Sequence, residues 1–293
     1  MEMEANVKTS KRRGSSFFLQ LMRNKPAFFG FLVICFFAVV AIFAPLIAPY
    51  PQDATVGSNI DERLLPPSSE HWFGTDELGR DVFSRVVMGS RLSLFVGVVA
   101  ILITMLIGIP LGALAGYYGG KLDECIMRVT DVFLAFPYLI LAMAIAVILR
   151  PGLYSAMVAI SLTWWPYYTR LVRGQALTMR KQPFVLAAKM MGEKNRTIIF
   201  RHVLPNCVGP IVVNASLDMG YIILACASLS FIGVGAQAPQ AEWGLMISTG
   251  RSFFMDAPWL TIFPGLAIFL TVLGFNLMGD GIRDILDPQA KPR

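Results

Sequence analysis

The sequence predicts an all-α membrane protein with six transmembrane helices and both termini on the cytoplasmic side. Of its 293 residues, 55% are hydrophobic and only 15% are charged, and the mean hydropathy is +0.60. A water-soluble domain of this length carries nearer a quarter charged residues. The apolar residues also fall in blocks long enough to cross a bilayer, so the composition excludes a single soluble globule and a disordered chain.

Six apolar blocks define the predicted spans. About 20 apolar residues at 1.5 Å each match a hydrocarbon core of about 30 Å. The first block is too long for the core of a signal peptide, so we expect it to remain as a helix. The blocks that meet this length are residues 26–48, 92–116, 127–149, 153–172, 207–235 and 259–279.

The Lys and Arg residues set the predicted orientation, because they collect on the cytoplasmic side of membrane proteins. With the amino terminus inside, 19 of the 25 Lys and Arg lie inside and six lie outside. Segment 1–25 is then a basic amphipathic lead-in, which either lies on the anionic lipid surface or acts only as a topology anchor. Segment 49–91 is an extracytoplasmic loop, 92–279 a five-helix core with a cytoplasmic loop at 173–206, and 280–293 a cytoplasmic tail.

The sequence shows no pattern for a catalytic, cofactor or metal site. The phosphate-binding pattern G-x-x-x-x-G-K-[ST] fails around Lys121, because Ala115 replaces its first Gly and Leu122 its Ser or Thr. The four Cys and two His residues lack the spacing of metal ligands. The net charge of +6 follows the membrane topology, so we expect no nucleic-acid partner. We therefore expect a non-catalytic protein whose energy source lies elsewhere.

Asp218 is the clearest ionisable residue inside a predicted span. An unpaired charge there costs roughly 2.5–3.5 kcal/mol on insertion scales, so we expect it to face the bundle interior. Asn214 lies one helical turn away, and the two residues form either a lining of a substrate path or an interhelical hydrogen bond. Proton-driven carriers place several ionisable groups along a path, and channels carry a filter. The sequence shows neither, which disfavours an ATP-independent carrier or channel; a scaffold subunit is a further alternative.

The cytoplasmic loop 173–206 contains a predicted short helix with apolar side chains. Pro183 suits the first helical position and Gly192 the left-handed stop, while Asn195 suits the N-cap of a second helix before Pro205 redirects the chain. An exposed apolar surface in a basic, water-facing loop indicates a partner protein, and a helix lying on the membrane is the alternative. The predicted contact residues are Phe184, Val185, Leu186, Ala187, Ala188, Met191, Gly192, Arg201 and Pro205.

This loop resembles the EAA loop of ABC-importer permeases, whose pattern is E-A-A-x3-G-x9-I-x-L-P. Leu186 stands where the pattern has Glu, and His202 stands where it has Ile. The resemblance implies that the helix docks in a groove of an ATPase subunit and transmits its closure to the pore. The positions that match are Ala187, Ala188, Gly192, Leu204 and Pro205.

Four further stretches are similar to the C-type permease of dipeptide, oligopeptide and nickel importers; they are residues 71–85, 128–137, 227–235 and 274–288. The resemblance implies the type I importer permease (MetI-like) fold in the bacterial inner membrane. It also implies a homologous second permease subunit, two ATPase subunits that bind ATP and magnesium, and an extracytoplasmic substrate-binding protein. The implied cargo is a di- or oligopeptide, with nickel or another metal chelate as the alternative.

The first of these stretches holds a group of charged and turn-forming residues outside the membrane. Gly and Asp residues commonly form turns, so we favour a structural role in which these residues shape the loop. The alternative is a contact with the substrate-binding protein. The residues concerned are Asp76, Arg80 and Asp81.

Overall fold

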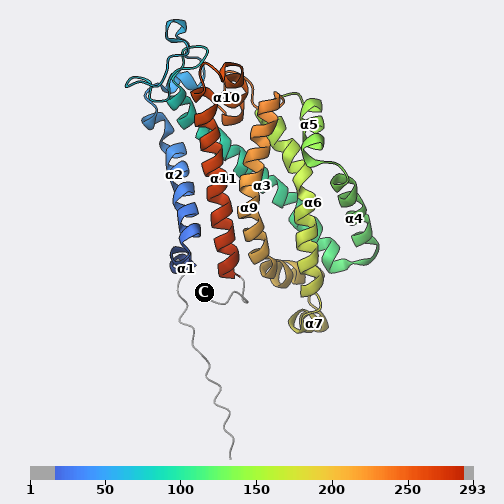
Figure 1. Cartoon of the computed structure of the whole chain (residues 1–293). Helices are drawn as coiled ribbons and strands as arrows, with labels where there is room; N and C mark the ends of the chain where they lie inside the picture. Colours follow the sequence, from blue (N-terminus) through green and yellow to red (C-terminus); the bar gives the residue numbers. More distant parts are fainter. Residues whose placement is uncertain (1–16, 287–293) are drawn as a thin grey trace, which may run out of the picture.

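The computed structural model describes residues 17–286, which fold into one bundle of helices (Figure 1). Residues 1–16 of the predicted lead-in and 287–293 of the predicted tail lie outside the described residues. The helices are α1 (Phe17–Arg23), α2 (Lys25–Ile47), α3 (Val82–Tyr118), α4 (Gly120–Leu134), α5 (Tyr138–Ile148), α6 (Leu153–Met179), α7 (Pro183–Met190), α8 (Asn195–Ile198), α9 (Leu204–Ile232), α10 (Trp243–Gly250) and α11 (Trp259–Leu286).

The bundle has two distinct ends. α1 and α7 lie at one end, which we call the α7 end, and α10 lies at the other, which we call the loop end (Figure 1). The segment between α2 and α3 also lies at the loop end, and it contains two short 3₁₀ turns, Pro51–Ala54 and Ile60–Glu62. The two ends therefore carry the two segments that the sequence analysis singled out.

Four helical stretches are long and apolar enough to cross a membrane on their own. They are α2, α3, α11 and the continuous stretch Asn195–Ile232, which joins α8 to α9. α6 is 27 residues long but is too polar to be counted with these four. The all-helical membrane fold is confirmed, and the count of six spans stays a prediction.

The predicted span 127–149 is not one straight helix. It breaks into α4 and α5, whose axes differ by 90°. The break falls at residues 135–137, because Pro137 disfavours a helical backbone at Phe136 and has no N–H to donate. If the bent pair counts as one span, the described residues hold five candidate spans.

α3 and α6 approach each other closely along a row of small residues. A Cβ added to Gly112 would lie 2.5 Å from the backbone oxygen of Thr169, and one added to Gly108 would lie 2.6 Å from the Cβ of Tyr168. The Thr169 hydroxyl donates to the backbone oxygen of Gly108 at 3.2 Å. Small residues and interhelical hydrogen bonds of this kind hold helices together where lipid replaces water.

Two elements at the loop end differ from the sequence prediction. α3 begins at Val82, ten residues before the predicted span 92–116, with Asp81 as its N-cap. The extension forms because residues such as Val82 and Ser84 are buried against the outer loop rather than exposed to water. The short helix α10 was not predicted, and it packs between α9 and α11.

Candidate functional site

The short helix α7 begins and ends as the sequence predicts. Gln182 is its N-cap and Pro183 occupies the first turn. Gly192 has a φ of +80°, which is the left-handed conformation that favours glycine. The backbone N–H of Glu193 donates to the carbonyl oxygen of Ala188 at 3.1 Å, which closes the turn.

α7 has one buried face and one exposed face. Val185 and Ala188 are only 2% and 3% exposed, and they belong to the same buried cluster as Ile198 and Val203. The prediction that Val185 is an exposed contact residue is therefore wrong, because this side chain seats the helix on the bundle, and Ala188 does the same. The exposed residues are Phe184, Leu186, Ala187, Met190 and Met191.

The segment that follows α7 departs from the prediction at its N-cap. Lys194, not Asn195, is the N-cap of α8, and the Asn195 side-chain oxygen accepts a 2.9 Å hydrogen bond from the Tyr117 hydroxyl at the end of α3. The π-helical turn Ile199–Val203 joins α8 to α9, so the chain stays helical through Pro205. Helices bend at π turns and at prolines, so a change of direction here does not require a break in the helix. Arg201 and Pro205 are exposed.

A polar pair ties the end of α7 to the π turn. His202 Nε2 lies 2.9 Å from Glu193 Oε2, and the ring centroids of Phe184 and His202 are 6.4 Å apart. The two polar side chains are 27% and 24% exposed. In the sequence His202 stands out only as a departure from the loop pattern, because it lies nine positions from Glu193 with a turn between them.

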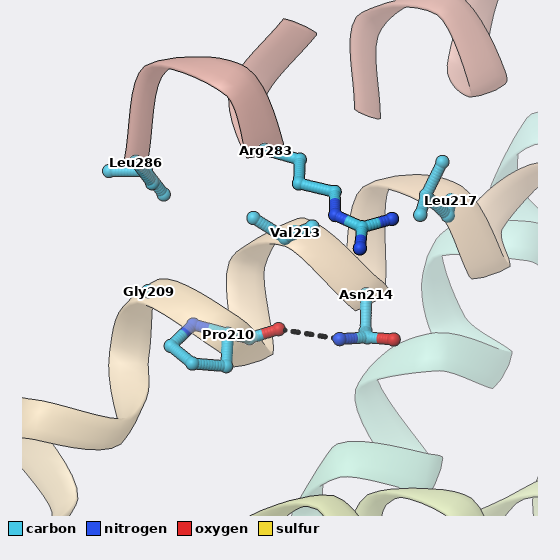
Figure 2. Close-up of a pocket in the computed structure, with 7 residues that line it drawn as sticks. All are labelled: Gly209, Pro210, Val213, Asn214, Leu217, Arg283 and Leu286. Carbon is cyan, nitrogen blue, oxygen red and sulfur yellow. Dashed lines mark hydrogen bonds between the residues drawn. The ribbon is translucent and has the colours of Figure 1, made fainter. Parts of the chain in front are cut away.

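A cavity of about 370 Å³ opens between α9 and α11 near the α7 end (Figure 2). Asn214 lines it, and its Nδ2 donates to the backbone oxygen of Pro210 at 2.9 Å. The Arg283 side chain points into the same space (Figure 2). The cavity therefore offers one cationic group and one amide between apolar walls. The apolar lining residues are Gly209, Pro210, Val213, Leu217 and Leu286.

Asp218 does not line this cavity. It is half-buried near the middle of α9, and it faces the Trp164 indole and the Tyr168 hydroxyl on α6. Asn214 and Asp218 therefore lie in different surroundings, although they stand one helical turn apart in the sequence. The role of either residue in a substrate path stays a prediction.

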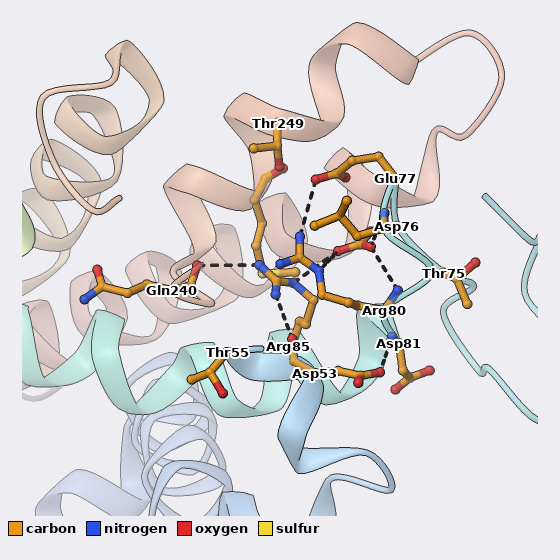
Figure 3. Close-up of polar contacts among 12 residues, drawn as sticks. Asp53, Thr55, Thr75, Asp76, Glu77, Arg80, Asp81, Arg85, Gln240 and Thr249 are labelled. Atoms are coloured by element: carbon orange, nitrogen blue, oxygen red, sulfur yellow. Dashed lines mark hydrogen bonds and ion pairs between the residues drawn. The ribbon is translucent and has the colours of Figure 1, made fainter. Parts of the chain in front are cut away.

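At the loop end, charged side chains form a buried network (Figure 3). Arg80 Nε lies 2.7 Å from Asp76 Oδ2, and Arg85 Nε lies 3.4 Å from the same oxygen. The Asp81 carboxylate accepts from the Ser84 backbone N–H at 2.7 Å and contacts His71 Nδ1 at 2.9 Å. Since Asp76, Arg80 and Asp81 are at most 5% exposed, the network supports the scaffold interpretation over a contact with another protein.

Arg85 and Asp53 extend the network to distant parts of the chain. Arg85 donates to the backbone oxygens of Asp53 at 2.7 Å and Gln240 at 3.5 Å (Figure 3). The Asp53 carboxylate accepts from the Asp81 backbone N–H at 2.8 Å, and burial raises the pKa of Asp53. No local sequence pattern marks either residue, because their partners lie up to 155 positions away.

Glu242 is a further buried acid that the sequence analysis missed. It is 3% exposed and caps α10, accepting from the backbone N–H groups of Gly244 and Leu245 at 3.0 and 2.9 Å. Burial raises the pKa of Glu242. The neighbouring Trp243 donates through Nε1 to the Val86 backbone oxygen at 2.9 Å, so α10 is locked to α3.

Comparisons with known proteins match this architecture over most of the chain. The sequence profile described as "Binding-protein-dependent transport system inner membrane component" matches residues 108–292, and the "N-terminal TM domain of oligopeptide transport permease C" matches residues 13–67. Among solved structures, the permease chain of the MetNI methionine ABC transporter in an inward-facing conformation aligns with a TM-score of 0.57. The alignment covers 69% of this chain and 96% of the MetNI chain at 20% sequence identity, so the likeness shows the fold alone.

Three relatives have similar lengths and sequences. The dipeptide transport system permease protein DppC of Alkalihalophilus pseudofirmus is 50% identical over 274 residues, which are 94% of this chain and 89% of the relative. The glutathione transport system permease protein GsiD of Pectobacterium atrosepticum is 45% identical, with 94% and 91% covered. The oligopeptide transport system permease protein OppC of Bacillus subtilis is 40% identical, with 93% and 88% covered.

Proposed function

Because this chain belongs to the family of binding-protein-dependent transport system inner membrane components, we propose that it forms half of the translocation pathway of an ATP-driven importer of di- or oligopeptides. It is a permease component of the inner membrane. The relatives named for dipeptide, oligopeptide and glutathione transport share short peptides as cargo, which supports the cargo class. The other half of the pathway is a homologous permease subunit, and a substrate-binding protein delivers the cargo from outside.

The observation that carries the proposal is the exposed apolar face of α7. Phe184 and Leu186 are each 45% exposed and Met190 is 87% exposed, although Val185 fixes the same helix to the bundle. A large apolar patch of this kind on a water-facing loop is stable only when a partner covers it, and Met side chains adapt to the walls of a groove. The partner is an ATPase subunit, one for each permease, which hydrolyses ATP while this chain remains non-catalytic.

The contacts of α7 give a route for the coupling. Closure of the ATPase subunits pushes α7, which is joined through Val185 and the Glu193–His202 pair to the π turn. That turn continues into α9, so the push reaches the walls of the pathway in the membrane. In this arrangement the α7 end is cytoplasmic and the loop end faces the binding protein.

Two matched substitutions test the docking of α7. Met190→Asp places a charge on the exposed face, and Met255→Asp places the same charge at the loop end, where the side chain is 90% exposed. We expect Met190→Asp to abolish copurification of the ATPase subunits and peptide uptake at an unchanged membrane level. Met255→Asp should retain both. Normal uptake by Met190→Asp would contradict the proposal.

A further inference from the structure

The break between α4 and α5 gathers aromatic rings near the middle of α6. Tyr138, the first residue of α5, has its ring centroid 5.0 Å from that of Trp164 at an interplanar angle of 89°. Tyr167 lies 5.2 Å from the same Trp164 ring system. A break in a helix at membrane depth is tolerated where it is buried in protein or lines a cavity. Tyr138 and Tyr167 are 38% and 46% exposed, so this aromatic group is open on one side.

Asp218 faces this aromatic group from α9. It is half-buried, and no Lys, Arg or His among the described residues forms an ion pair with it. Tyr168 is 1% exposed and Trp164 is 9% exposed, and both direct their polar atoms towards Asp218. Within residues 17–286, the Tyr168 hydroxyl and the Trp164 N–H have no other acceptor, so these two buried donors orient the carboxylate.

The site therefore lacks a cation for the carboxylate. The protonated amino terminus of a peptide supplies one. Aromatic faces also attract ammonium groups through their quadrupoles. A metal ion fits less well, because the described residues hold no group of three or more His, Cys, Asp or Glu that could bind one.

We propose that Asp218, oriented by Tyr168 and the Trp164 N–H, binds the protonated amino terminus of the cargo peptide as it crosses the membrane, and that the Trp164 and Tyr138 rings line the same site. This inference rests on the proposed peptide import and adds the chemical group that the chain recognises. It assigns to Asp218 a contact with cargo in addition to its interhelical contacts with Tyr168 and Trp164.

The test uses the complete importer in liposomes, with alanylalanine and N-acetylalanylalanine as cargo. The variants are Asp218→Asn, which removes the charge, and Asp218→Glu, which keeps it. Ser216→Ala is the control, because this serine lies on the same helix and its hydroxyl donates to the Val212 backbone oxygen. Uptake by each variant is divided by wild-type uptake of the same peptide, so the selectivity of the binding protein cancels. ATP turnover is measured in parallel.

We expect Asp218→Asn to reduce alanylalanine uptake at least tenfold, with N-acetylalanylalanine uptake and ATP turnover within twofold of wild type. Asp218→Glu should keep a third or more of alanylalanine uptake, and Ser216→Ala should behave as wild type. The inference is overturned if Asp218→Asn keeps alanylalanine uptake within twofold, or loses both peptides equally. If the wild-type importer does not take up N-acetylalanylalanine, the two Asp218 variants decide. Alanylalanine uptake that is lost in Asp218→Asn and kept in Asp218→Glu supports the inference, and an equal loss of uptake in both variants overturns it. A wild-type importer that takes up neither peptide instead refutes the proposed function.

Discussion

His202 Nε2 donates a 2.9 Å hydrogen bond to Glu193 Oε2 across the turn that ends α7. This pair joins the exposed helix to the π turn next to Gly192, where an added Cβ would meet no atom within 4 Å. The chain lacks the Glu of the loop pattern at Leu186, and this pair supplies a polar contact elsewhere in the same loop.

The first prediction concerns this pair. A half-buried pair of this type stabilises its local structure by about 1 kcal/mol, which corresponds to about a fivefold change in a population. We expect His202→Gln and Glu193→Gln each to lower peptide uptake per ATP hydrolysed by up to about fivefold, with the double variant no worse than either. Uptake and ATP turnover in liposomes measure the ratio. Additive losses in the double variant would show that the two residues act separately.

The second prediction concerns the contact between α3 and α6. A Cβ at position 112 would lie 2.5 Å from the Thr169 backbone oxygen, so Gly112→Ala must push the helices apart. We expect a loss of about 1–3 kcal/mol in the free energy of unfolding, seen as a lower Tm of the detergent-solubilised complex. Gly174→Ala on α6 is the control, because its Cβ would meet nothing within 4 Å. An unchanged Tm for Gly112→Ala would mean that the helices are farther apart than the structure shows.

The third prediction concerns Arg85. Arg85→Ala removes one cationic partner of Asp76 and two hydrogen bonds that join distant segments. Loss of one member of a buried charge network costs about 3–5 kcal/mol, so we expect the variant to fall to a low level in the membrane. The control is Arg91→Ala, since Arg91 is exposed on the same helix and such surface changes stay within about 0.5 kcal/mol. Quantitative immunoblots of membranes compare the two; equal levels would place Arg85 outside the scaffold.

The fourth prediction concerns orientation. Cys125 is exposed at the start of α4, whereas Cys207 and Cys226 are buried. We expect a membrane-impermeant maleimide to label Cys125 in inside-out vesicles and not in right-side-out vesicles. A Met255→Cys substitution in a chain with Cys125→Ser should show the reverse labelling. If Cys125 reacts only in right-side-out vesicles, the α7 end is not cytoplasmic.

The sequence predicted elements whose signals are local. The apolar block 26–48 became α2 (Lys25–Ile47) within one residue at each end, because a long run of apolar side chains has few alternatives in a membrane. Pro183 and Gly192 marked the limits of the exposed helix, because both act locally. Pro183 fixes φ at a helical value, and Gly192 adopts the positive φ that ends the helix. The direction in which the exposed face of this helix points could not be predicted, because it depends on Val185 packing against α8.

Other features escaped prediction because they depend on contacts far along the chain. Pro137 allows a break in the predicted span 127–149, but the 90° angle between α4 and α5 depends on tertiary contacts such as Tyr138 packing on Trp164. The eight residues of α10 include two glycines, and its stability comes from the Glu242 cap and the burial of Trp243. The charged network at the loop end joins Asp53, Arg85 and Gln240, which no sequence pattern connects.

The helix α9 has a mechanical consequence. Its 29 residues extend about 44 Å at 1.5 Å per residue, which exceeds the thickness of the hydrocarbon core. Because the π turn joins α9 to α8 within one helical stretch, a tilt imposed near the α7 end moves the far end of α9 in the same stroke. An opening near α10 would then need no relay of smaller moving parts between the two sides of the membrane.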